Sequence, residues 1–265
     1  MSSSEPASVT FSLQVFAQHG GRTAPHKDGW GIAYYADTDV QLIRDTTCAS
    51  NSQWVQFVER QALRSTLVMS HIRMATIGAV AIKNTQPFSR ELGGRMHVFA
   101  HNGHLPKIRQ QRHCRIGAFH PVGDTDSEYA FCVLLERLSS LWRVAEGVPE
   151  LATRLALVEK FAADLRDIGL ANFLYCDSDV MFAHGHRRKQ ADGEFKSPGL
   201  HLLRRQCAGK DAHADTAGVT VTSSSQEVVL VASVPLTDEA WEPFVEGEVV
   251  VASPAHFTRR PELRS

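Results

Sequence analysis

The order of apolar patterns along the chain predicts a single-domain, layered α+β sandwich. Short apolar or β-branched runs typical of strands recur in the first hundred residues, two long helical patterns follow, and strand-like runs return after residue 170. This order is typical of helices packed on mainly antiparallel sheets and differs from a regular βαβ parallel sheet. A chain of 265 residues with 43% hydrophobic residues can bury a large core, and no Pro/Gly/Ser-rich linker divides it. We therefore expect one domain over residues 1–265.

Apolar spacing and turn residues predict the elements of the first half. In order, they are a helix over 9–17 that stops at Gly20-Gly21, a hairpin formed by 31–36 and 40–44, a short helix over 54–58, and strands over 66–73 and 95–101. Both of these last strands end in polar residues, so their ends should form the rim of a site.

The second half begins with the long helical patterns 126–141 and 151–170, and the second of them carries charges spaced three or four residues apart. The strands expected after them are a hairpin formed by 173–176 and 180–184, and further strands over 201–205, 228–233 and 248–252. The polar stretches 186–199 and 207–225 are expected to be loops.

Composition excludes several classes of function. The net charge of −1 argues against a nucleic-acid-binding surface, which normally carries a basic excess. Five widely spaced cysteines form no C-x-x-C pair, so they indicate reduced thiols in the cytoplasm and not a disulfide framework. The sequence also shows no signal peptide and no apolar stretch long enough to cross a bilayer. We expect a soluble cytoplasmic protein with a small-molecule substrate, no nucleic-acid or membrane partner, no cofactor and no metal; a homodimer is left open.

Three polar clusters interrupt the apolar runs. Arg73 follows a strand, and its guanidinium can clamp a carboxylate. Asn102-Gly103 suits a simple type I′ turn, but the Asn amide and the Gly N–H can also stabilise an oxyanion. Asp126 lies among the helix-capping residues 124–128, and its carboxylate can hold an ammonium group. Together the three clusters suit a zwitterionic amide substrate.

These clusters belong to a longer series of motifs that resembles the class II glutamine amidotransferases, a family of N-terminal-nucleophile hydrolases. The motifs are residues 26–33 (HKDGWGIA), 71–78 (HIRMATIG), 84–88 (NTQPF), 101–103 (HNG) and 125–128 (TDSE). Residues 228–237, before Trp241, resemble the closing strand and loop of stand-alone bacterial members. The resemblance covers nearly the whole chain and implies a four-layer αββα sandwich with mainly antiparallel sheets, the N-terminal-nucleophile hydrolase fold.

The resemblance also implies residue roles. Arg73 would bind the α-carboxylate of glutamine, and Asp126 its α-amino group. Asn102 and Gly103 would form the oxyanion hole, while His26 and Thr76 would line the pocket. The substrate would be glutamine or a γ-glutamyl compound, because related stand-alone proteins include γ-glutamyl hydrolases of thiol metabolism. The acceptor of any released ammonia is not indicated.

The chain departs from the family at two places. Gln86 stands where members usually carry histidine, which puts a supporting contact in question. Members open with Met-Cys and a short apolar strand, whereas Met1 here matches a later Met. The resemblance therefore implies that the strand with the nucleophile is missing, and Ser2 lies about half a dozen positions too late in a Ser- and Pro-bearing stretch that does not suit a buried strand.

The five cysteines cannot replace the nucleophile, because an internal cysteine lacks the free α-amine that serves as the base. They are Cys48, Cys114, Cys132, Cys176 and Cys207. We expect the chain as written to be inactive toward glutamine. Either the start site is assigned too late, which we favour because the other site residues are present, or the chain is a glutamine-binding pseudoenzyme that acts as a sensor or scaffold.

Two readings from other classes are less well supported. Thirteen histidines, among them His97, His101, His104, His184 and His186, suggest a metal-dependent hydrolase, but they form no H-E-x-x-H or mixed Cys/His spacing. A simple interaction module would not need three polar clusters at strand ends.

Overall fold

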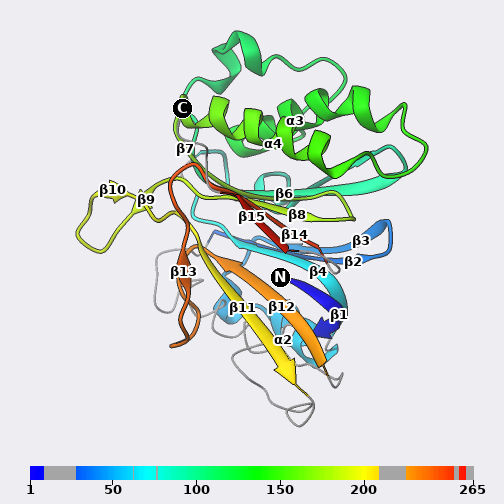
Figure 1. Cartoon of the computed structure of the whole chain (residues 1–265). Coiled ribbons are helices and arrows are strands. Elements are labelled where there is room, and N and C mark those ends of the chain that lie inside the picture. The colour runs from blue at the N-terminus through cyan, green and yellow to red at the C-terminus, as the bar shows by residue number, and fades with distance from the viewer. Residues whose placement is uncertain (9–27, 62, 76, 209–224, 254–256, 261–265) are drawn as a thin grey trace.

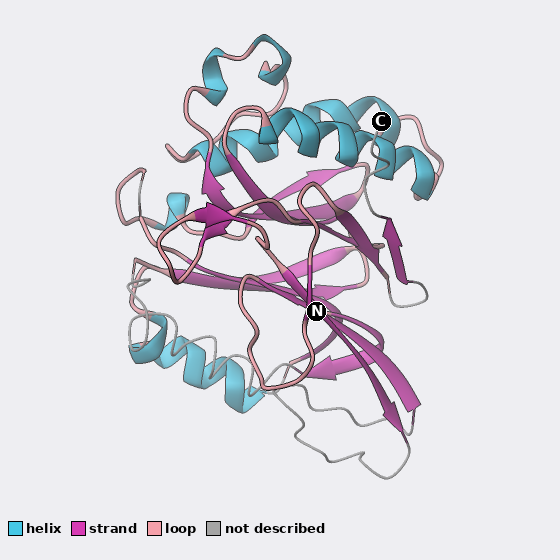
Figure 2. Ribbon diagram, turned by 60° about the vertical axis from the view of Figure 1, so that its left-hand side comes forward, coloured by secondary structure: helices cyan, strands magenta, loops and turns pink. Residues whose placement is uncertain are grey.

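The computed structural model describes residues 1–265 except 9–27, 62, 76, 209–224, 254–256 and 261–265. Two β-sheets lie face to face in the middle of the molecule, and helices cover the outer face of each (Figures 1 and 2). Every strand pair in the two sheets is antiparallel. The expected four-layer αββα sandwich is confirmed.

One sheet has seven strands. In spatial order they are β13 (Glu242–Pro243), β11 (His201–Ala208), β12 (Ser225–Ala232), β1 (Ser2–Ser8), β4 (Arg64–Ile72), β2 (Trp30–Ala36) and β3 (Asp39–Asp45). The expected hairpin of β2 and β3 is present, with Asp37 in the left-handed conformation at its turn.

The other sheet has six strands. In spatial order they are β15 (Phe257–Arg260), β14 (Val249–Ala252), β8 (Met181–His184), β7 (Leu170–Cys176), β6 (Arg95–His104) and β5 (Phe88–Leu92). A separate two-stranded hairpin, β9 (Arg188–Lys189) and β10 (Phe195–Lys196), lies in a stretch expected to be loop, and it projects from the body at the left of Figure 1.

Three apolar cores hold the four layers together. The helices α3 (Asp126–Trp142) and α4 (Leu151–Arg166) pack on the six-stranded sheet around the rings of Phe99, Phe131 and Phe161. Helix α2 (Gln53–Gln61) packs on the outer face of the seven-stranded sheet through Val55 and Val58, and a third core lies between the sheets. Burying one such side chain stabilises the fold by roughly 1.5 to 3 kcal/mol.

Short 3-10 helices complete the described structure. They are η1 (Ala49–Asn51), η2 (Ile82–Asn84), η3 (Ile108–Gln110) and η4 (Arg112–Cys114). Among the described residues, no helix is long and apolar enough to cross a membrane.

Strand β1 corrects the expectation that residues 2–8 do not suit a sheet. It lies between β12 and β4, with Ser2 and Ser3 almost fully buried. Pro6 lies where the pairing with β4 is interrupted by a bulge, so the missing N–H of proline breaks no regular ladder. The hydroxyl of Ser3 donates to the Glu5 carbonyl, and that of Ser4 accepts from the Glu227 N–H. Serine side chains thus satisfy backbone groups around the bulge.

The end of α4 also differs from the sequence expectation. The pattern 151–170 predicts one helix, but α4 ends at Arg166, because the N–H groups of Ile168 and Gly169 both bond to the Leu165 carbonyl and Leu170 begins β7. The helix expected over 9–17 lies outside the described residues.

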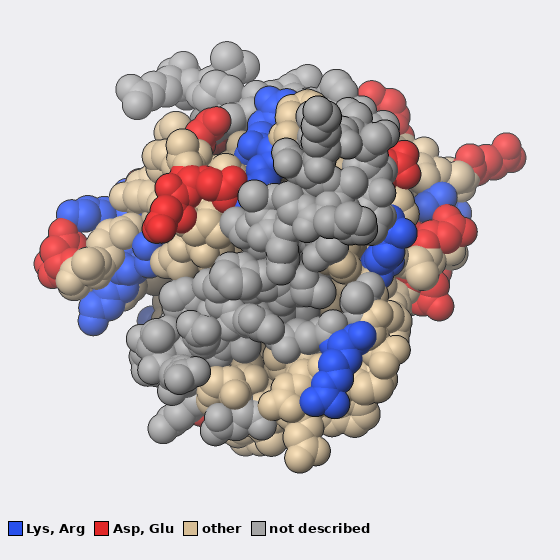
Figure 3. All heavy atoms as spheres, turned by 90° about the horizontal axis from the view of Figure 1, so that it is seen from below, with Lys and Arg blue, Asp and Glu red and all other residues tan. Residues whose placement is uncertain are grey.

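Among the described residues seen from below in Figure 3, basic and acidic side chains are interspersed. The projecting β9–β10 hairpin, at the left edge of this view, carries both signs, and Lys196 pairs with Asp192 there.

Candidate active site

Asn102 and Gly103 lie near the end of β6, where the strand is still paired, and not in a hairpin turn. Asn102 is paired with Asn172 of β7, and Gly103 with Ala171. The type I′ turn considered for this Asn-Gly pair is therefore wrong. Asn102 is exposed, and its side-chain Nδ2 donates to the Oγ of Ser233 at 3.2 Å. The strand thus presents an amide donor at an open end of the sheet.

Strand packing alone requires a glycine at position 103, whether or not a ligand binds there. A Cβ at this position would lie well inside van der Waals contact of the Leu170 carbonyl oxygen on β7. Only glycine lets the two strands approach this closely at the point where β6 ends.

His101, the residue before Asn102, is held in place by hydrogen bonds of its backbone and its side chain. Gln86 lies opposite His101 and forms two hydrogen bonds with its backbone: Nε2 donates to the carbonyl at 3.1 Å, and the His101 N–H donates to Oε1 at 2.6 Å. The imidazole bonds through Nδ1 to the Ser127 hydroxyl and through Nε2 to the Leu170 carbonyl, each at 2.9 Å. Burial lowers the pKa of His101, and nearby Asp126 opposes this effect. Gln86 therefore holds β6 directly.

Asp126 is the first residue of α3. Thr125 is the N-cap, and its hydroxyl accepts from the Glu128 N–H at 3.2 Å. The Oδ2 of Asp126 accepts from the Leu105 N–H at 2.7 Å and lies 3.3 Å from the Nδ1 of His104. The carboxylate is therefore held at the end of β6, two residues beyond Gly103.

Arg73 follows β4 and is buried, with only 4% of its surface exposed. Its Nη2 donates to the carbonyls of Ile77 and Gly78 at 2.9 and 3.0 Å, and its backbone N–H donates to Gly29 at 2.8 Å. Burial lowers the pKa of Arg73, and Asp28 opposes this effect. The guanidinium thus holds the loop that follows its own strand.

Asn84 links the Arg73 loop to the start of α3. A Cβ at Gly78 would lie 2.8 Å from the Nδ2 of Asn84, and the Oδ1 of Asn84 accepts from the Asp124 N–H at 2.8 Å. Arg73 and Asp126 therefore belong to one continuous set of contacts, with fully buried Asn84 between them. His26 and Thr76, the other two residues expected to line the pocket, lie outside the described residues.

Sequence reasoning missed two residues beside Asn102. The side-chain Nδ2 of buried Asn172 donates to the carbonyls of Asn102 and Arg187, at 3.1 and 2.8 Å. Ser233 accepts from Asn102 across the two sheets. Neither residue carries a sequence signal, because their proximity to Asn102 arises only from strand pairing. Asn84 belongs to the motif over residues 84–88, but the motif alone does not predict its contacts.

The amino-terminal group of Met1 is buried in the middle of the sandwich. It donates to the Val68 carbonyl of β4 at 2.8 Å, and burial lowers its pKa to about 6. The thiol of Cys176, on the facing sheet, is close enough to interact with it, and burial raises the pKa of that thiol to about 12. The four cysteines with described side chains are free, and burial also raises the pKa of Cys114 and that of Cys132. These three buried thiols are poor nucleophiles because the reactive form is the thiolate.

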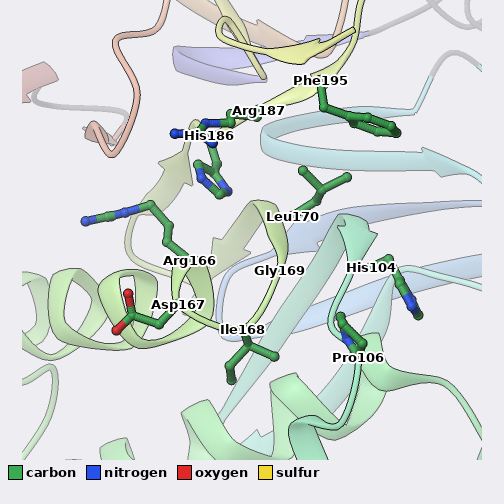
Figure 4. Close-up of a pocket in the computed structure, with 10 residues that line it drawn as sticks. All are labelled: His104, Pro106, Arg166, Asp167, Ile168, Gly169, Leu170, His186, Arg187 and Phe195. Carbon is green, nitrogen blue, oxygen red and sulfur yellow. The ribbon is translucent and has the colours of Figure 1, made fainter. Parts of the chain in front are cut away.

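A cavity of about 400 Å³ lies beside this set of residues (Figure 4). It is lined by His104, Pro106, Arg166, Asp167, Ile168, Gly169, Leu170, His186, Arg187 and Phe195. Its lining shares His104 with the surroundings of Asp126 and contains none of Arg73, Asn102, Gly103 or Asp126. Two of its basic side chains face an acid, since Arg187 and His186 lie 2.7 and 3.6 Å from the carboxylate of Glu246.

The histidines considered as metal ligands make other contacts. His97 lies 2.6 Å from the Tyr175 hydroxyl through Nδ1 and 3.0 Å from the Leu92 carbonyl through Nε2. The Nδ1 of His184 lies 3.1 Å from the Glu248 carbonyl. Within the part of the chain that the structure describes, no group of three or more His, Cys, Asp or Glu side chains could hold a metal ion.

The family model described as "Glutamine amidotransferases class-II" matches residues 1–260. The chain belongs to this family. It is 35% identical over 254 residues to "Putative glutamine amidotransferase YafJ" of Escherichia coli, an alignment that covers 94% of this chain and 93% of that protein. A "Putative glutamine amidotransferase" of Haemophilus influenzae is 32% identical over 256 residues, covering 94% of this chain and 81% of that protein.

Solved structures show the same fold. The crystal structure of a "predicted glutamine amidotransferase" from Pseudomonas aeruginosa has a TM-score of 0.64 at 30% identity, covering 91% of this chain and 90% of that one. Glutamine phosphoribosylpyrophosphate amidotransferase of B. subtilis has a TM-score of 0.58 at 15% identity, and the match covers 95% of this chain but 45% of that one. This second likeness shows the fold alone. Membership of a glutamine amidotransferase family makes a glutamine-type substrate the ligand class to consider for this chain.

Proposed function

We propose that this glutamine amidotransferase domain hydrolyses the side-chain amide of glutamine or of a γ-glutamyl compound, with Asn102 and Gly103 as the oxyanion hole. One observation carries the proposal: β6 ends with the exposed amide of Asn102, and the carboxylate of Asp126 is bonded to that same strand end at Leu105. A preorganised donor next to a fixed carboxylate suits an amide substrate that carries an ammonium group. A single oxyanion donor contributes roughly 3 to 4 kcal/mol in known hydrolases.

In the proposed complex, Arg73 binds the α-carboxylate and Asp126 the α-amino group. The continuous contacts through Asn84 support this assignment, because they bring both groups to the ends of β4 and β6. A guanidinium has five N–H donors, so the three bonds of Arg73, to the carbonyls of Ile77, Gly78 and Asp28, leave donors for a carboxylate. On the family resemblance, His26 and Thr76 complete the pocket.

We further propose that the nucleophile is a cysteine on residues that continue β1 beyond Met1. Met1 and Val68 exchange two backbone hydrogen bonds, and Val68 lies five positions before Arg73 on β4. If the strand continued in this antiparallel register, the fifth residue before Met1 would lie opposite Arg73. That residue would be about 17 Å from Met1, at about 3.3 Å per residue. Ser2 cannot take this role. It is paired with Leu67 and Val229, whose side chains belong to the core between the sheets, and its Oγ is buried.

The experiment compares ammonia release from glutamine by the chain that begins at Met1 and by a chain extended with the residues encoded upstream. The shorter chain should release none above background. The extended chain, if its added residues include Met-Cys, should be active, and replacing that cysteine by alanine should abolish the activity. Activity of the shorter chain would refute the assignment of the nucleophile.

The alternative is a pseudoenzyme that binds glutamine as a sensor or scaffold. The presence of Arg73, Asn102, Gly103 and Asp126 together favours the enzyme. An extended chain that carries the cysteine, binds glutamine and releases no ammonia would favour the pseudoenzyme instead. The free cysteines support a reducing compartment such as the cytoplasm.

A further inference from the structure

Arg188 is a cation without an acidic partner in the described structure. It begins the projecting β9–β10 hairpin, and its Nε is buried without a hydrogen-bond partner among the described residues. The side chain makes one long hydrogen bond, from Nη1 to the Lys189 carbonyl at 3.4 Å. Burial lowers the pKa of Arg188. By contrast, the guanidinium of the preceding residue, Arg187, is paired with Glu246.

Contacts on two sides connect the surroundings of Arg188 to Asn102. On one side, Asn172 donates to the carbonyls of both Asn102 and Arg187, so the base of the hairpin is tied to β6. On the other side, Asn102 bonds to Ser233, which directly follows the residue that pairs with His201. His201 is close enough to Arg188 for the two to repel each other, and its Nδ1 is also buried without a partner in the described part of the chain.

This cluster lies on the opposite side of Asn102 from Arg73. Strand β6 is flanked by β5 and β7. The contacts toward Arg73 run through residues 84–86, which precede β5, whereas those toward Arg188 run through Asn172 of β7. A substrate whose amino-acid head group faces Arg73 and whose carbonyl oxygen faces Asn102 would therefore extend its leaving group toward Arg188.

We propose that Arg188, with His201 and Ser233, binds a carboxylate on the leaving-group side of the scissile amide, so that the preferred substrate is a γ-glutamyl amino acid or peptide and not glutamine. The inference rests on the proposed function, since it assumes the orientation set by Arg73 and Asn102. A guanidinium with free donors beside an imidazole and a hydroxyl is a suitable carboxylate site. Glutamine has an ammonia leaving group and cannot use these donors.

The test uses calorimetry on the full chain, with γ-glutamylglycine and its neutral counterpart γ-glutamylglycinamide as ligands and glutamine as the reference. Wild type should bind γ-glutamylglycine about 10- to 100-fold more tightly than the neutral amide, as expected for a charge-assisted hydrogen bond. The preference should shrink as the salt concentration rises. Arg188→Gln should remove the preference and leave glutamine affinity unchanged.

Arg187→Gln is the matched control, because that neighbouring guanidinium is already paired with an acid. It should keep the preference for the carboxylate. The subsite would be overturned if wild type bound γ-glutamylglycine and γ-glutamylglycinamide equally, or if the Arg188→Gln variant kept the preference. Glutamine binding in the same experiment would leave the proposed function standing. If wild type bound none of the three ligands, both the subsite and the proposed function would be overturned.

Discussion

Lowering the pH through neutrality is expected to destabilise the fold through the amino-terminal ammonium group of Met1. This group is buried between the sheets, and its pKa falls from 8.0 to about 6 because burial disfavours the charged form. Each pKa unit corresponds to about 1.4 kcal/mol, so the penalty for protonating the folded chain is about 3 kcal/mol. Between pH 8 and pH 6 the unfolded chain binds a proton that the folded chain does not. The free energy of unfolding should therefore fall as the pH is lowered through this window, and the loss should be complete below about pH 6.

Acetylation of the Met1 amine supplies the control. An acetylated chain has no amine to protonate, and the acetyl group continues the backbone between β12 and β4. The control is needed because buried histidines add a loss of the same sign: the pKa of His97 is lowered to about 4 and that of His184 to about 3. Their contribution is common to both chains and cancels in the difference.

The measurement is urea unfolding of both chains at a series of pH values from about 5.5 to about 8.5. The stability difference between acetylated and free chains should grow by about 2 kcal/mol as the pH falls across this range. A difference that does not change with pH would show that the amine is solvated in the folded protein, and the burial of Met1 would then be wrong.

Three substitutions test other parts of the structure. Gly103→Ala should reduce the free energy of unfolding by more than about 2 kcal/mol in urea melts, because its Cβ would meet the β7 backbone, whereas Gly117→Ala, where the nearest atom lies 3.7 Å away, should stay within about 1 kcal/mol. Asp177→Asn should cost about 3 to 5 kcal/mol, because it breaks a buried ion pair with an arginine of α4, and the exposed partner variant Asp179→Asn should cost much less; equal losses would contradict this. Arg73→Ala should weaken glutamine binding by about 1.5 to 3 kcal/mol in calorimetry, and unchanged affinity would exclude its carboxylate role.

Most of the sandwich could be predicted from local sequence pattern. The hairpin of β2 and β3, helix α3 and the hairpin of β7 and β8 all follow from turn residues and apolar spacing. Strand β1 could not be predicted in this way. Its serine-rich sequence does not predict a strand, and the hydroxyls of Ser3 and Ser4 bond to backbone groups around a bulge, including one on β12 more than two hundred residues away.

The candidate site divides in a similar way. Arg73, Asn102, Gly103 and Asp126 could be selected because their types suit the substrate and their order matches the family, and their roles stay predictions. The residues around them could not be selected from the sequence. Asn172 and Ser233 gain their proximity to Asn102 only through tertiary pairing, and an isolated Asn or Ser carries no pattern that identifies it.

The central position of β1 has a consequence for the order in which the protein folds during synthesis. Strands β1, β4, β2 and β3 are complete once the first 72 residues are made, but β12, the other neighbour of β1, begins at Ser225. Until that segment leaves the ribosome, β1 is an exposed edge strand, and such edges readily pair with other chains. Closure of the sheet thus depends on a contact between the two ends of the sequence, which slows folding. We expect nascent chains shorter than about 230 residues to need protection by chaperones, and full-length chains to lose that need once β12 is in place.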